Sequence, residues 1–176
     1  IILGHSMGGK TAMEFSIQHP DQLDRLIVVD IAPVQYEVHH YAIIDALESV
    51  DLKEIQSRKD ADQVLSSKIS EFGVRQFLLK NLYWREKDQL DWRFNLSILK
   101  NEILPISQFS ISDGTFHKPT LFVKGELSNY ILSDYEERIH SKFSNCDIVE
   151  IKGAGHWVHA EKMKEFSSLI LKFLNE

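Results

Sequence analysis

A short apolar run leads directly into a glycine-rich turn at the start of the chain, and this junction constrains the fold more than any other feature. Ile1-Ile2-Leu3 is typical of a buried strand, and Gly4-His5-Ser6-Met7-Gly8 follows it without a spacer. Residues 7–19 then carry apolar side chains at helical spacing, and residues 26–29 form a second apolar run. Strand, helix and strand in this order, with short connections, predict a parallel sheet that helices cover on both faces.

The glycine-rich turn has the pattern G-x-S-x-G, which is typical of a sharp strand-to-helix turn that presents a nucleophilic serine. Such a turn leaves space only for small residues two positions before and after Ser6, where Gly4 and Gly8 stand, and Gly9 adds room where the helix crosses the sheet. The serine is expected in strained backbone geometry. The N–H of Met7, at the positive end of the helix, is expected to bind an oxyanion. An inert serine in a glycine-rich turn is the alternative.

The strand pattern stops after Pro33 and gives way to helical periodicity. From about residue 36 to residue 109 no clear strand pattern is present, and a polar link that carries tryptophans, residues 84–92, separates the helical segments. The helical segments are residues 40–50, 61–72, 74–82 and 94–104. We therefore expect an all-helical insertion, the cap, over residues 36–115.

Strand patterns return after Pro119. Residues 120–124 and 147–151 are typical of strands, residues 134–143 lie between them with helical spacing, and residues 160–174 form a last amphipathic helix. Residues 1–35 and 116–176 together are expected to form one α/β domain with a parallel sheet, which the insertion interrupts.

A nucleophilic serine at neutral pH needs a general base, and imidazole has a matching pKa. His156 stands in the loop Gly153-Ala154-Gly155-His156-Trp157, after the last strand and before the last helix. This loop lies at the carboxyl edge of the sheet, where Ser6 also emerges and where ligands bind in such folds. His159 is expected at the start of the last helix. His5 lies within the turn and is expected to pack there or to line the substrate pocket.

The acid that would orient the imidazole has several candidates. The loop after residues 120–124 is one usual place, but Ser128 stands there where an aspartate is expected. Glu126 directly follows a glycine turn, and Asp134 is expected to open a helix. Asp30 ends the apolar run 26–29 and needs a partner if it is buried. Its alternative role is to cap the turn before Pro33.

Other histidines raise the question of a metal site. His39-His40 and His117 are candidates, but no second cluster with ligand spacing accompanies them. We therefore expect neither a metal nor another cofactor.

The composition excludes several classes of function. The net charge of −6 argues against general nucleic-acid binding, which needs a basic face. No apolar run approaches the roughly 20 residues that a membrane span requires. The single cysteine, Cys146, excludes an internal disulfide and is compatible with the cytoplasm, where we expect the protein. The sequence predicts no oligomeric state.

Several segments along the whole chain resemble the bacterial YbfF esterases of the α/β-hydrolase superfamily. The turn around Ser6 is shared by all such hydrolases, whereas Asp30-Ile31-Ala32-Pro33 and the stretch G-A-G-H-W-V-H-A-E-K at residues 153–162 are more specific to this branch. The remaining similar segments are residues 74–80 and 92–95.

The resemblance implies a serine esterase that acts on small-molecule substrates, namely short esters and acyl-CoA thioesters, with a helical cap over the active site. It assigns the acid to Asp30 and gives Ser128 a place beside the histidine. It also implies that Trp157 lines the cleft.

Family members carry a further segment before the serine turn, with the first strands and an H-G motif that supplies the second oxyanion donor. We therefore expect this chain to be a fragment that lacks the N-terminal strands. The strand before Ser6 would then be an unpaired edge, and the chain alone is expected to fold poorly or to be inactive.

Two alternatives to an esterase remain. A serine hydrolase that cleaves carbon–carbon bonds in ring-fission products shares both turn and cap, and a ligand-binding relative with a vestigial site would share the fold. Epoxide hydrolases and haloalkane dehalogenases are disfavoured because they carry an aspartate where Ser6 stands.

Overall fold

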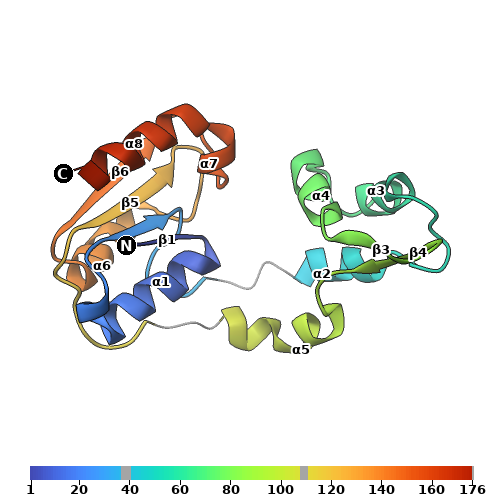
Figure 1. The fold of residues 1–176 in the computed structure, drawn as a ribbon, viewed down its shortest axis with the longest axis horizontal. Helices are drawn as coiled ribbons and strands as arrows, with labels where there is room; N and C mark the ends of the chain where they lie inside the picture. Colours follow the sequence, from blue (N-terminus) through green and yellow to red (C-terminus); the bar gives the residue numbers. More distant parts are fainter. Residues whose placement is uncertain (37–40, 108–110, 176) are drawn as a thin grey trace. The chain divides into compact units, whose positions relative to one another are not determined.

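The computed structural model describes residues 1–36, 41–107 and 111–175. The chain divides into two compact units. One, here the sheet unit, consists of residues 1–35 and 109–176, and the other, the insertion unit, of residues 36–108. Figure 1 shows the elements of both units.

The sheet unit contains four strands in the order β1-β2-β5-β6, and every neighbouring pair is parallel. The strands are β1 (Ile2–His5), β2 (Leu26–Val29), β5 (Thr120–Gly125) and β6 (Cys146–Ile151). All four residues of β2 are buried, because the strand has neighbours on both sides and helices over both faces. The predicted parallel sheet of an α/β fold is confirmed.

Helices cover the two faces of this sheet. Figure 1 shows α1 (Met7–Gln18) on one side and α8 (Met163–Asn175) on the other. Alternate strand residues, among them Ile27 and Val123, pack with Phe173 of α8. The remaining elements are η1 (Pro20–Gln22), η2 (Ser133–Tyr135), α6 (Glu136–Lys142) and α7 (Val158–Glu161).

The prediction of a single last helix is wrong. Lys162, with φ −133° and ψ 53°, leaves the helical region and separates α7 from α8. The short helix α7 therefore has its own direction, and it follows directly on the loop that carries His156.

The insertion unit has a hydrophobic core of its own, which includes Leu47, Leu65, Leu79 and Trp92. Its helices are α2 (Tyr41–Glu48), α3 (Arg58–Ser66), α4 (Phe72–Leu79) and α5 (Leu96–Ser107). Ion pairs join α3 to α4 and α2 to α5.

The expectation of an all-helical insertion is wrong at residues 84–92. The strands β3 (Leu82–Glu86) and β4 (Gln89–Trp92) form an antiparallel hairpin there. Asp88 makes the turn with φ 62°, a conformation that aspartate tolerates better than most residues. Leu82, Leu90 and Trp92 are buried in the core of the unit, so burial on one face of the hairpin outweighs its polar sequence.

Within the described residues, no helix is both long and apolar enough to cross a membrane.

Candidate active site

The predicted site residues follow neighbouring strands at the carboxyl edge of the sheet. Ser6 comes directly after β1 and Asp30 directly after β2. Their backbone N–H groups extend the ladder, since Ser6 donates to the carbonyl of Val29 at 2.9 Å and Asp30 to that of Val123 at 2.8 Å. The loop with His156 follows β6. Parallel strands thus bring residues distant in sequence to one edge.

Ser6 has the strained backbone expected of this turn, with φ 53° and ψ −124°. The turn is tight because a Cβ at Gly4 would lie 2.3 Å from the carbonyl oxygen of Gly8, and a Cβ at Gly9 would lie 2.5 Å from Ile31 Cγ2. The expectation for Gly8 is wrong within this chain, because a Cβ there meets no atom within 4 Å. It is the carbonyl of Gly8, and not its lack of a side chain, that restricts Gly4.

The imidazole of His156 lies between the serine and a carboxylate. Nδ1 is 2.7 Å from Asp30 Oδ2 and Nε2 is 3.0 Å from Ser6 Oγ. An ionised carboxylate only accepts hydrogen bonds, so Nδ1 carries the hydrogen and Nε2 of the neutral ring accepts from the serine hydroxyl. This is the tautomer in which a histidine can take a proton from serine.

Asp30 is completely buried, and three donors surround its carboxylate. Oδ1 accepts the N–H of Gly125 at 3.0 Å, and Oδ2 accepts the hydroxyl of Ser128 as well as His156 Nδ1–H. These charge-assisted hydrogen bonds offset the loss of water around the charge. The backbone of Asp30 is also unusual, with φ 52°.

The other two candidates for the acid lie elsewhere. Glu126 Oε2 accepts the N–H of Gly153 at 2.7 Å, at the far end of the histidine loop from His156. Asp134 lies in η2. The structure therefore brings Asp30, and neither of these two, to the imidazole.

His5 and Tyr130 pack against His156. The ring centroids of His5 and His156 are 4.7 Å apart, and Nε2–H of His5 donates to the His156 carbonyl at 2.9 Å. Burial lowers the pKa of His5. The Tyr130 ring lies 4.1 Å from that of His156, and burial with the charge of Asp30 raises the pKa of Tyr130.

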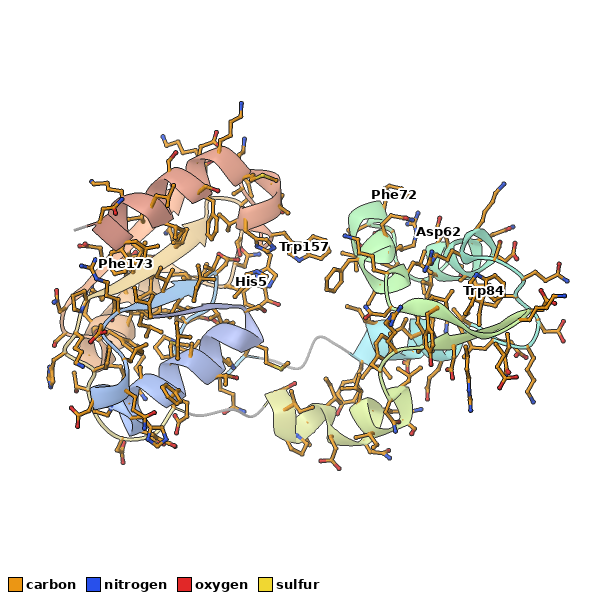
Figure 2. The ribbon with its side chains drawn as sticks, in the orientation of Figure 1. His5, Asp62, Phe72, Trp84, Trp157 and Phe173 are labelled. Carbon is orange, nitrogen blue, oxygen red and sulfur yellow. The ribbon has the colours of Figure 1, made fainter. Side chains whose placement is uncertain are left out.

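Three further predicted residues lie around the turn and the loop. Met7 begins α1, so its N–H has no carbonyl partner within the helix, and its side chain is exposed. His159 lies within α7, and its ring packs edge-on against His5 at 4.8 Å. Trp157 is half-buried; Figure 2 shows it and His5 at one end of the sheet unit, with Phe173 at the other.

Sequence reasoning missed several contacts of the site. No local signal marks Tyr130 or the N–H of Gly125, because both reach the site through the fold. Glu161 accepts hydrogen bonds from the backbone on both sides of His156. The sequence feature that could have pointed to Glu161 is its position in the stretch 153–162, which is one of the segments that carry the family resemblance.

The histidines considered as metal ligands give no site. His117 Nδ1 lies 2.7 Å from the hydroxyl of Ser144, and His39 and His40 lie outside the described residues. Over residues 1–36, 41–107 and 111–175, no group of three or more His, Cys, Asp or Glu side chains is placed to hold a metal ion.

A serine, a histidine and an aspartate at the carboxyl edge of a parallel sheet, with the serine in a strained strand-to-helix turn, define the α/β-hydrolase class. Comparison with known proteins agrees. A solved marine microorganism esterase is 41% identical with a TM-score of 0.92, over 98% of this chain and 69% of that one.

Curated relatives extend the comparison. Esterase YbfF of Escherichia coli is 36% identical over 99% of this chain and 66% of its own length. The sn-1-specific diacylglycerol lipase ABHD11 of Mus musculus is 39% identical over 99% of this chain and 58% of its own length. The chain thus spans less than two thirds of the length of the lipase ABHD11. No family model matches.

These similarities confirm the resemblance found in the sequence: the chain belongs to the YbfF-type esterases of the α/β-hydrolase superfamily.

Proposed function

We propose that the protein hydrolyses carboxylic esters through an acyl-enzyme intermediate on Ser6. The observation that carries the proposal is the continuous chain of hydrogen bonds from Ser6 Oγ through His156 to the buried carboxylate of Asp30. Relatives named as esterases and a lipase support the same chemistry.

In the first step Ser6 Oγ attacks the carbonyl carbon of the substrate while His156 Nε2 takes the hydroxyl proton. Asp30 holds the ring through Nδ1–H and stabilises the imidazolium. The N–H of Met7, at the positive end of α1, binds the oxyanion of the tetrahedral intermediate. His156 then returns the proton to the leaving alkoxide, and the acyl group stays on Ser6.

In the second step His156 takes a proton from a water molecule, which attacks the acyl carbonyl. The intermediate collapses, the bond to Ser6 Oγ breaks, and the proton on Nε2 returns to the serine while the free acid leaves. Water is the only co-reactant.

The finer specificity belongs to the same proposal. Short esters and acyl-CoA thioesters are the expected substrates, because an acyl-enzyme forms from either and the resemblance to the YbfF branch implies both. We assign substrate contacts to Trp157 and His5, and the role of a cap to the insertion unit. In the sequence this unit begins at residue 36, six positions after Asp30. The cytoplasm is the compartment that we propose.

The test is a comparison of wild-type full-length protein with Ser6→Ala, using p-nitrophenyl butyrate, a series of acyl-CoAs and a ring-fission product as substrates. We expect ester turnover by the wild-type protein, and a reduction of at least about 10⁴-fold in Ser6→Ala, since the residual rate then comes only from the oxyanion site and binding. Turnover of the ring-fission product alone would favour the carbon–carbon hydrolase. If the protein turned over none of these substrates and a fluorophosphonate did not label Ser6, a ligand-binding protein would be favoured.

A further inference from the structure

The loop that carries His156, residues 152–157, is held by contacts that the reaction itself does not use. It contains Gly153, with φ 65°, and Gly155, so its own sequence gives the backbone wide conformational freedom. The imidazole nevertheless has to meet Ser6 Oγ on one side and Asp30 Oδ2 on the other, at 3.0 and 2.7 Å. Something beyond the loop sequence has to restrict the backbone.

The carboxylate of Glu161 binds the N–H groups of the residues immediately before and after His156. Its Oε2 accepts the N–H of Gly155 at 2.6 Å, and its Oε1 accepts the N–H of Trp157 at 3.2 Å. One turn of helix makes this possible, because α7 begins at Val158 and the N–H of Glu161 returns to the Trp157 carbonyl at 2.9 Å. The side chain thus points back along the chain to the loop that precedes its own helix.

The carbonyl group of His156 also has a side-chain partner. Its carbonyl accepts Nε2–H of His5 at 2.9 Å. Three successive residues are therefore each bound to a side chain through a backbone group: Gly155 by its N–H, His156 by its carbonyl and Trp157 by its N–H. Glu161 supplies two of these three contacts, and a carboxylate makes stronger hydrogen bonds than a neutral acceptor.

We propose that Glu161 is a positioning residue, which holds the imidazole of His156 between Ser6 and Asp30. It does so by binding the N–H groups of the residues before and after His156. The inference rests on the proposed esterase function. Glu161 touches neither Ser6 nor the imidazole in the contacts described above, so it acts on the reaction through the backbone of His156. Without it, the glycines let the ring drift, and a displacement of about 1 Å can reduce the rate about 100-fold.

The experiment compares full-length wild-type protein with Glu161→Ala and Glu161→Gln in the hydrolysis of p-nitrophenyl butyrate. Glu161→Ala removes both contacts, and we expect kcat to fall between about 10-fold and 100-fold with KM changed by less than about threefold. Glu161→Gln keeps an oxygen acceptor for one N–H, and we expect its kcat to lie between the other two. The matched control is Glu165→Gln, an exposed glutamate of α8, which is expected to match wild type.

Two further measurements separate positioning from general stability. The rate of Ser6 labelling by a fluorophosphonate is expected to fall in parallel with kcat, because it depends on the contact between Ser6 and His156. The thermal unfolding midpoint of Glu161→Gln is expected to stay close to that of wild type. If Glu161→Ala fails to fold, the comparison of Glu161→Gln with wild type decides.

The outcomes are distinct. The positioning role would be overturned if both Glu161 variants had the kcat and the labelling rate of wild type, and the esterase proposal would then stay intact. If the alanine variant does not fold, Glu161→Gln alone decides. A loss of activity matched by an equal loss of folded protein would also overturn it. No turnover by the wild-type protein would overturn the proposed function and, with it, the role of Glu161.

Discussion

The serine turn, residues 4–9, and the histidine loop, residues 152–157, hold the two reacting side chains by different means. In the turn, the position of Ser6 follows from neighbouring backbone: a strand, a strained serine and glycines that let the strand and helix touch. In the loop, backbone groups are held by side chains from other parts of the chain, namely His5, Glu126 and Glu161.

One close backbone contact complements these side chains in the loop. A Cβ at Gly125, at the end of β5, would lie 2.2 Å from the carbonyl oxygen of Gly155. The loop is therefore in close contact with the end of β5 and is also bound by the carboxylates of Glu126 and Glu161. The difference shows that the conformation of a tight turn can be fixed by its own backbone, whereas a glycine-containing loop needs contacts with other residues to fix its conformation.

The largest effect on kcat is expected from a change at Asp30, the carboxylate that holds the imidazole of His156. Asp30→Asn places an amide next to His156 Nδ1, which favours the tautomer with hydrogen on Nε2, so the ring no longer accepts from Ser6. We expect kcat to fall about 10⁴-fold with the protein still folded. Steady-state kinetics and circular dichroism on the full-length protein measure both. Near-normal turnover in Asp30→Asn, together with a total loss in Glu126→Gln, would move the acid to Glu126.

A smaller effect, on the free energy of unfolding, is expected from changes at the glycines of the serine turn. Gly4→Ala forces a methyl group to 2.3 Å from the backbone of Gly8 and is expected to lower the free energy of unfolding by about 3 kcal/mol. Gly8→Ala meets open space in a helix and is expected to leave this free energy unchanged or raise it by up to about 1 kcal/mol. Urea unfolding of the two full-length variants measures the contrast. Equal destabilisation would mean that Gly8 is restricted as tightly as Gly4.

The smallest effect concerns His5, which belongs to the turn and binds the loop. Burial lowers the pKa of His5 below its ordinary 6.5, and His156, His159 and Asp30 are the titratable groups around it. The unfolded chain therefore binds a proton more readily than the folded one, and the free energy of unfolding decreases as pH falls below about 6.5. His5→Gln, which keeps an N–H donor, is expected to weaken this decrease.

Urea unfolding at about pH 7 and about pH 5 measures the pH dependence. The control is His117→Gln, a change at an exposed histidine of the sheet unit. A His5→Gln variant with the same pH dependence as wild type would show that His5 titrates alike in the folded and unfolded chain.

The parts predicted best from the sequence are those with a local cause. The bounds of β2 agree with its apolar run, and α1 ends one residue before the predicted His19, because apolar spacing and Pro20 act over a few residues. The hairpin of β3 and β4 was missed, since a polar link gives no strand signal until its few apolar residues find a core. The break at Lys162 was missed for the same reason: the amphipathic pattern runs on through it.

The sequence by itself determined that Ser6 stands in a strand-to-helix turn and that His156 lies in a loop at the same edge of a parallel sheet. It left the acid open among Asp30, Glu126 and Asp134 until a resemblance was considered. Only the tertiary structure decided which carboxylate meets the imidazole, because Asp30 and His156 are 126 positions apart in the chain and meet through the pairing of β2, β5 and β6. Local patterns report contacts between near neighbours, and long-range contacts exist only once the strands have paired.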